Sequence, residues 1–152
     1  MPDGQAGDIN IKISDMRNIK FIVIHCSATP QTATINSMIR YWKEQLHWNN
    51  PGYHYIIKPC GEVIQLLEEE KPSNGVAGFN SVTINVCYIG GIRPDGSPAD
   101  NRTPEQKAAL VFLLEQLKER YPKAVIQGHR DFPNVKKACP GFDAKSEYKN
   151  IR

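Results

Sequence analysis

Residues 19–25, IKFIVIH, form a continuous run of mostly β-branched and apolar side chains. A short run of this kind is typical of a strand that is buried on both faces, as in a sheet covered by helices. Polar residues follow at once in HCSATP, which places His25 at the carboxyl end of the strand. Residues 83–91 and 123–129 have the same character, and the second of these runs ends in His129.

The remaining segments predict two helices and a hairpin around these strands. Residues 34–47 have apolar side chains at helical spacing, and residues 103–122 have Thr103 as a cap and a proline at each end. Residues 53–67 are typical of two strands joined by a tight turn, and the last ten residues favour a short helix. The order β-α-β-β-β-α-β-α predicts a single α/β domain with a mixed central sheet flanked by helices.

Length and charge limit the possible classes of protein. The 152 residues suit one domain, and the net charge of +3 is mild. No dense Lys/Arg run with interleaved aromatic residues is present, so we expect no nucleic-acid partner. No apolar run approaches the ~20 residues of a membrane span. The polar residues 1–18 have no secretory apolar region and are expected to form a flexible arm before a domain at 19–152. We expect this domain to act as a monomer.

The four cysteines form no C-x-x-C pair, and a chain with an adequate core does not need disulfides, so reduced thiols are expected. Cys139 follows His129 by ten residues in GHRDFPNVKKACPGFD, a segment too rich in turns to be a helix. If the strands that end in His25 and His129 run the same way in one sheet, both imidazoles lie on the same rim. Two imidazoles, one thiolate and an open fourth position are typical of a catalytic zinc site. The alternative is a set of ordinary core residues, a hydrogen-bonded histidine and a small apolar cysteine.

Several blocks of the chain, in order, resemble the zinc-dependent N-acetylmuramoyl-L-alanine amidases, the family of small phage lysozyme-amidases and peptidoglycan recognition proteins. The blocks are FIVIHCSAT, GYHYIIKPCGEV, NVCYIGGI, TPEQKAAL, GHRD and KKACPGFD, from about residue 19 to residue 143. The resemblance implies the amidase fold, a Zn²⁺ cofactor, and a peptidoglycan or muropeptide substrate. The implied reaction is hydrolysis of the amide between N-acetylmuramic acid and the L-alanine of the stem peptide.

The resemblance also implies roles for five residues. The zinc ligands of the family fall on His25, His129 and Cys139. Its catalytic lysine falls on Lys137, which would stabilise the developing oxyanion. Its tyrosine near the zinc falls on Tyr53, which would hydrogen-bond the attacking water or relay a proton to the leaving amine. Taken without the resemblance, Lys137 is a surface lysine and Tyr53 is a packing residue.

Two positions depart from the family pattern. Many relatives have a histidine in an HA-x-GYN stretch that borders the substrate, whereas this chain reads NGVAGFN and has Val76 where that histidine is expected. Asn74 is the residue that would replace the contact. Asn85 stands where the strand of the family usually has a glycine.

Two other functions stay open. A non-catalytic peptidoglycan-binding module would fit the altered loop at 74–80, but members of that kind often lack the cysteine ligand. A thiol hydrolase would use Cys26 or Cys139 with a histidine, and a chelator would leave it active. For the amidase we expect synthesis in the cytoplasm and action on the cell wall after release or delivery, with phage or prophage lysis first. The other routes are the recycling of imported wall fragments and export by a secretion machine.

Overall fold

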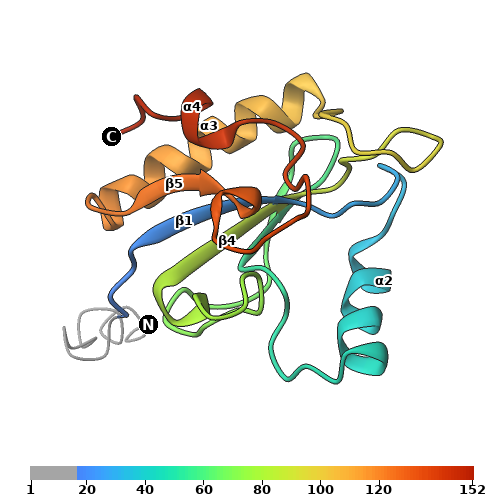
Figure 1. The fold of residues 1–152 in the computed structure, drawn as a ribbon, viewed down its shortest axis with the longest axis horizontal. Coiled ribbons are helices and arrows are strands. Elements are labelled where there is room, and N and C mark those ends of the chain that lie inside the picture. The colour runs from blue at the N-terminus through green and yellow to red at the C-terminus, as the bar shows by residue number, and fades with distance from the viewer. Residues whose placement is uncertain (1–16) are drawn as a thin grey trace, which may run out of the picture.

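The structure is a computed structural model that describes residues 17–152. Five strands form one mixed sheet in the order β3-β2-β4-β1-β5 (Figure 1). The strands are β1 (Phe21–Cys26), β2 (Tyr55–Ile57), β3 (Val63–Gln65), β4 (Thr83–Tyr88) and β5 (Val125–Gly128). Strand β1 pairs in parallel with β4 and β5, β2 pairs in parallel with β4, and only β3 runs antiparallel to its neighbour. The predicted mixed sheet is confirmed.

Helices cover both faces of this sheet. Helix α3 (Pro104–Arg120) and the short α4 (Ala144–Glu147) lie on one side, and α2 (Ile35–Arg40) stands on the other (Figure 1). The Thr103 hydroxyl accepts the Gln106 N–H at 3.0 Å, and the Gln106 side chain accepts the Thr103 N–H in return. This capping box explains why α3 begins where its sequence predicts. No helix of the described residues 17–152 has the length and apolar character to span a membrane.

A helix is present in the region predicted at 34–47, but it changes from α-helical to π-helical along its length. Thr34 caps α2 through a hydrogen bond from the Ser37 N–H at 3.1 Å. After Arg40 the chain widens into a π-helical segment, η2 (Tyr41–Gln45). His47 then takes a left-handed conformation, with φ of 58°, which ends the helix.

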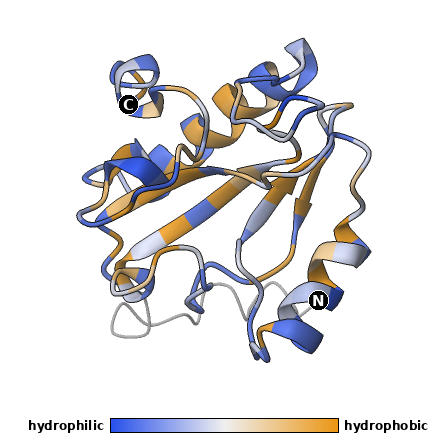
Figure 2. Cartoon of the chain, turned by 45° about the vertical axis from the view of Figure 1, so that its right-hand side comes forward, coloured by the Kyte–Doolittle hydropathy of each residue, from blue (hydrophilic) through white to orange (hydrophobic). Residues whose placement is uncertain are grey.

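Alternation along the strands separates the core into two sides. Figure 2 shows that most residues of the strands are hydrophobic. The side chains packed between the sheet and α3 are mainly apolar. The residues packed together on that side include Ile22, Ile24, Ile84, Val86, Tyr88, Leu110, Leu114 and Leu117. The opposite side packs on α2 through Met38 and on η2 through Trp42, and it also buries polar groups, His25 and Asn85 among them.

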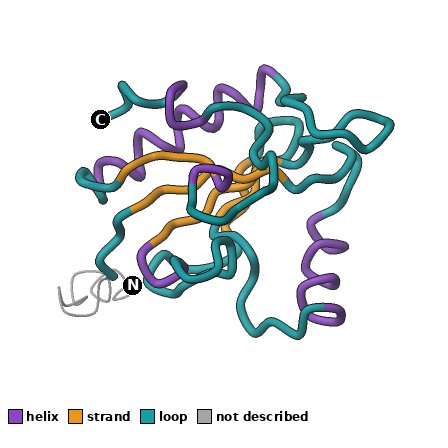
Figure 3. Tube along the Cα trace, viewed as in Figure 1, coloured by secondary structure: helices purple, strands orange, loops and turns teal. Residues whose placement is uncertain are grey.

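The segment between β5 and α4 is loop except for one 3-10 turn, η4 (His129–Asp131) (Figure 3). A second 3-10 turn, η3 (Asn80–Val82), leads into β4. Both turns lie beside strand ends, where polar side chains can gather without interrupting the sheet. The predicted arm at 1–18 falls outside the described residues except for its last two positions, and the proposed boundary at residue 19 stays a prediction.

Candidate active site

His25 and His129 lie at the carboxyl ends of neighbouring parallel strands. His25 is the fifth residue of β1, and His129 directly follows β5. Because β1 and β5 pair in parallel, both side chains reach the same edge of the sheet, and their ring centroids are 4.8 Å apart. The two histidines predicted to share one rim therefore lie side by side.

Cys139 reaches the same edge because its loop folds back onto the strand ends. The Arg130 N–H donates to the Cys139 carbonyl at 2.9 Å, and the Tyr88 hydroxyl donates to the Pro140 carbonyl at 2.6 Å. The Cys26 N–H donates to the sulfur of Cys139 at 3.2 Å. These contacts hold the thiol against the carboxyl end of β1.

One potential ligand atom from each of His25, His129 and Cys139 lies within 4.8 Å of the other two. The Sγ atom of Cys139 is 3.9 Å from Nδ1 of His25. Tetrahedral zinc, with bonds of about 2.0–2.3 Å, separates its ligand atoms by roughly 3.4–3.7 Å. Small side-chain adjustments would bring the three atoms to that spacing, so the residues present fit a zinc ion with a fourth position open.

Both imidazoles are held in the neutral form that a metal ligand requires. Burial, with a smaller effect from His129, lowers the pKa of His25 to about 3. Burial and the nearby Lys137 also lower the pKa of His129. At neutral pH each ring therefore keeps a lone pair free.

The thiol of Cys139 is poorly placed to act as a free nucleophile. A hydrogen bond with the Cys26 thiol, together with burial, raises the pKa of Cys139. A protonated thiol is a weak nucleophile, whereas a bound metal ion would deprotonate it. This environment argues against Cys139 as the nucleophile of a thiol hydrolase.

Tyr53 and Lys137 border the same hollow as the three potential ligands. The hollow measures about 180 Å³ and has all five predicted residues in its wall. The Tyr53 ring lies 4.9 Å from the His25 ring, between centroids, and packs edge-on against Trp42. Burial raises the pKa of Tyr53 well above its usual value, so the phenol keeps its proton. Lys137 is exposed at the rim.

The hollow continues over the helical wall formed by α2 and η2. A larger depression of about 630 Å³ shares Trp42, Trp48, Tyr53 and Lys137 with the site and extends toward Tyr41. Trp42 is only 7% exposed, as expected of a core residue, yet it lies in the walls of both. This continuous cleft is long enough to hold more than the atoms of one amide group.

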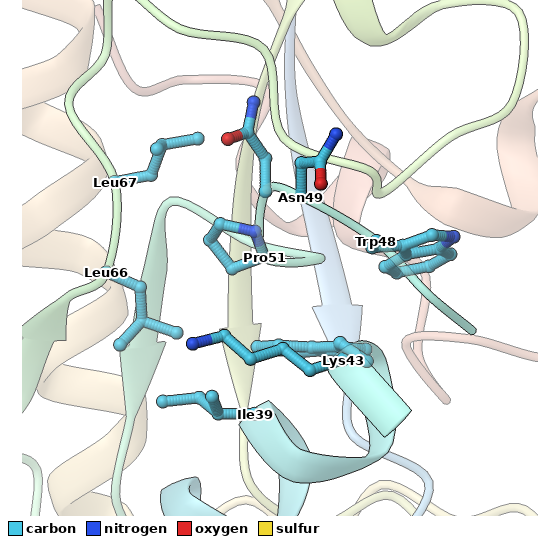
Figure 4. A pocket seen from close by; sticks show the side chains of 9 residues that line it. Ile39, Lys43, Trp48, Asn49, Pro51, Leu66 and Leu67 are labelled. Atoms are coloured by element: carbon cyan, nitrogen blue, oxygen red, sulfur yellow. The ribbon is translucent and has the colours of Figure 1, made fainter. Parts of the chain in front are cut away.

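Another hollow, of about 300 Å³, lies between η2 and the residues that directly follow β3, Leu66 and Leu67. Its walls are mainly apolar, and Figure 4 shows the Lys43 side chain extending across it toward Leu66. It shares Trp42 and Trp48 with the site, so the two tryptophans separate it from the cleft.

The loop that departs from the family pattern also borders the site, although not through Val76. Val76 is buried and packs with Val23 and Phe132. Asn74 and Gly75 line the hollow instead, and the Asn74 amide donates to the Asn50 carbonyl at 2.8 Å. The residues of this loop that face the site are therefore Asn74 and Gly75, one or two positions before Val76, where the family pattern places its histidine.

Sequence reasoning missed the part played by Asn85, which it treated as a minor change. The Oδ1 atom of Asn85 lies 2.7 Å from Nε2 of His25. The only signal in the sequence is an amide in the middle of an apolar strand, a residue type that is buried only when its polar atoms have partners. The buried ring of His54 accepts the Asn85 N–H at 3.0 Å, so His54 has a structural role beside this strand.

Two imidazoles and a thiol, with a fourth position open, fit the three-ligand pattern of a catalytic zinc site. The family model for N-acetylmuramoyl-L-alanine amidase matches residues 15–142. The endolysin of Klebsiella phage KP32 is 41% identical over 125 residues, which cover 82% of each chain. The endolysin of Enterobacteria phage K11 is 40% identical over 121 residues, 79% of each chain.

Among solved structures, the Ph2119 endolysin from the Thermus scotoductus MAT2119 bacteriophage superposes with a TM-score of 0.71. It is 24% identical, and the match covers 89% of this chain and 88% of the other, which supports the fold. The chain belongs to the N-acetylmuramoyl-L-alanine amidase family, and its activity is the hydrolysis of peptidoglycan amides.

Proposed function

We propose that this amidase is zinc-dependent and that His25, His129 and Cys139 hold the ion. The observation that carries the proposal is the approach of their three ligand atoms to within 4.8 Å, beside a hollow that also contains Tyr53 and Lys137. The substrate is the amide that joins the lactyl group of N-acetylmuramic acid to L-alanine. When bound, zinc would polarise the amide carbonyl and lower the pKa of a water to about 7.

Lys137 supplies a positive charge at the rim of the hollow. Its side chain is anchored only two residues before Cys139, so the ammonium group stays close to the reacting carbonyl. Negative charge develops on the carbonyl oxygen as the amide is attacked, and an ammonium group at that point stabilises it. We therefore assign to Lys137 the stabilisation of the oxyanion.

Tyr53 acts as a hydrogen-bond donor. Its phenol stays protonated at neutral pH because burial raises its pKa. The position of the ring, against both His25 and Trp42, limits the directions in which the hydroxyl can point. We assign it to orienting the attacking water or the leaving nitrogen, and both assignments predict a loss of turnover in Tyr53→Phe.

The same arrangement disfavours a purely binding role. A recognition module needs a cleft but has no use for two neutral imidazoles and a thiol that converge on one point. The endolysin relatives support a lytic role, in which the chain is made in the cytoplasm and meets the cell wall after its release. We also propose that it works as a monomer, because every group assigned to the reaction comes from one chain.

The test is digestion of purified peptidoglycan, followed through the release of new amino-terminal L-alanine. We expect release by the protein as prepared, loss of release in a strong chelator, and recovery when zinc is added back. Binding of the wall without any release in the presence of zinc would move the protein to the recognition class. Release that survives the chelator would remove zinc from the account.

A further inference from the structure

The side chain of Asn85 lies at the centre of a buried polar network beneath the site. It is 0% exposed and comes from the middle of β4. Its Oδ1 atom is 2.7 Å from Nε2 of His25, and its Nδ2 atom is 2.8 Å from the Ser73 hydroxyl and 3.3 Å from the Thr83 hydroxyl. Each polar atom of the amide therefore has a partner inside the protein.

The neighbouring His54 determines which atoms of this network donate hydrogen bonds and which accept them. The main-chain N–H of Asn85 donates to Nδ1 of His54 at 3.0 Å, so that nitrogen carries no proton. The Ser73 hydroxyl lies 3.1 Å from the same nitrogen, and because that nitrogen has no proton to give, only the hydroxyl can be the donor in this contact. Its oxygen is then free to accept a hydrogen bond from Nδ2 of Asn85, which leaves Oδ1 to face His25.

An amide oxygen that faces an imidazole nitrogen accepts a proton from it. His25 is thus held as the tautomer protonated on Nε2, and its Nδ1 lone pair lies on the side of Cys139, 3.9 Å from the sulfur. Metal-binding histidines are commonly oriented in this way, by an acceptor on the ring nitrogen that does not bind the metal.

We propose that Asn85 is a positioning residue of the metal site, which selects the Nε2-protonated tautomer of His25 and presents its Nδ1 atom to the ion. The proposal rests on the proposed zinc ligands. It assigns no contact between Asn85 and the substrate. A carboxamide suits this task because it accepts from His25 and donates to Ser73 at the same time.

Gly75 makes room for this amide. A Cβ atom at residue 75 would overlap three atoms of the Asn85 side chain, Cγ, Oδ1 and Nδ2. The two places where the chain departs from its family pattern, the loop at 74–80 and Asn85, are therefore in direct contact. A Gly75→Ala substitution would push the amide from its position without changing any atom that hydrogen-bonds.

The first readout is the tautomer of His25 in the zinc-free protein, measured by long-range ¹H–¹⁵N NMR of the imidazoles. The wild type should show His25 protonated on Nε2 alone. Asn85→Leu, which keeps the size but has no acceptor, should show a mixture of tautomers. Asn85→Asp, which keeps an acceptor, should restore the Nε2-protonated form. An unchanged tautomer in Asn85→Leu would overturn the proposal.

The second readout is zinc affinity, measured by competition with a chromophoric chelator. Loss of an orienting partner of this kind weakens metal binding by about 10–100-fold, and we expect that range for Asn85→Leu and a smaller loss for Asn85→Asp. Gln106→Leu is the matched control, since Gln106 is also a buried amide, donating to the carbonyls of Ile57 and Ile89 away from the site. Its zinc affinity should equal that of the wild type.

The outcomes separate this inference from the function on which it rests. A wild type that binds no zinc would defeat the proposed metal site itself. A wild type and an Asn85→Leu variant that bind zinc equally well would defeat only the role of Asn85. If Asn85→Leu does not fold, Gly75→Ala takes its place in both measurements, with the same expected directions and the same contradicting result.

Discussion

The two sides of the central sheet use buried residues in different ways. The side toward α3 is mainly apolar, with Leu110, Leu114 and Leu117 each 0% exposed. The side toward α2 and the loop of Cys139 buries His25 and Asn85 as well as apolar groups. Both sides belong to the same strands, so the alternation of side chains along each strand separates them.

The difference shows where the molecule obtains its stability and where it places its chemistry. Burial of an aliphatic side chain is favourable wherever it packs well. A buried imidazole or amide is tolerated only when partners satisfy its polar atoms, and a missing partner costs about 1–3 kcal/mol. Changes on the α3 side should therefore alter stability, and changes on the site side should alter metal binding and turnover.

The largest effect should follow removal of a proposed ligand. Cys139→Ser should lower amidase turnover by about 10³-fold or more, because several kcal/mol of transition-state stabilisation depend on the ion. Turnover on peptidoglycan and bound zinc per chain are the measurements. Cys60→Ser, at an exposed thiol outside the site, is the control and should change neither. Full activity in Cys139→Ser would contradict the claim that the site side of the sheet holds a catalytic metal ion.

Loss of the charge at the rim should affect turnover alone. Lys137→Ala should reduce kcat by about 10²–10³-fold, the effect of removing one group that stabilises an oxyanion. Zinc affinity should stay within about twofold, because Lys137 is not a proposed ligand. Lys136→Ala is the matched control, an exposed lysine one residue away. Equal losses in the two variants would make the effect one of general surface charge.

A cavity on the α3 side should affect stability alone. Leu114→Ala should lower the free energy of unfolding by about 2–5 kcal/mol, because the fully buried side chain leaves a space that the core fills only in part. Urea unfolding of the zinc-free protein measures it. Phe112→Ala, on the same helix but with 63% of the residue exposed, should change stability by less than about 0.5 kcal/mol. Zinc affinity should not change in either variant, and a loss in Leu114→Ala would show that the two sides are coupled.

The smallest effect is a dependence of stability on pH that arises on the polar side. Burial lowers the pKa of His54 to about 4, below the value of about 6.5 in an unfolded chain. The stabilisation is complete above about pH 6.5 and is lost as the pH falls toward 4, because the unfolded state binds the proton first. Between pH 7 and pH 5 the loss from this group is at most about 2 kcal/mol, and urea unfolding of the zinc-free protein over this range measures it.

His25 adds to the same slope, since burial lowers its pKa to about 3. Addition of zinc should keep or steepen this slope, because the ion excludes protons from its ligands in the folded state and these groups take up protons on unfolding. Stability that stays constant from pH 7 to pH 5 would mean that these rings take up protons at the same pH in the folded and unfolded states, contrary to their burial.

The elements of the fold were predictable because their signals are local. Thr103 and Gln106 form the cap expected at the start of α3, and the apolar runs that end in His25 and His129 are strands. Parallel pairing then follows from the order of strands and helices, and it brings the two histidines to one edge.

The details of the site were less predictable because they depend on contacts between distant segments. The hydrogen bond between Asn85 and His25 joins β4 and β1 across 60 positions in the chain, and it depends on strand register and side-chain orientation. The inward position of Val76 likewise results from packing against Phe132 in a later loop. A local pattern contains no information about either partner.

The central claim is that His25, His129 and Cys139 bind zinc, and zinc K-edge X-ray absorption of the loaded protein tests it most directly. The account predicts one sulfur at about 2.3 Å and two imidazole nitrogens at about 2.0–2.1 Å, with one light atom completing the shell. Cys139→Ser should remove the sulfur and leave the imidazoles. A wild-type shell without sulfur, or with more than one, would contradict the account.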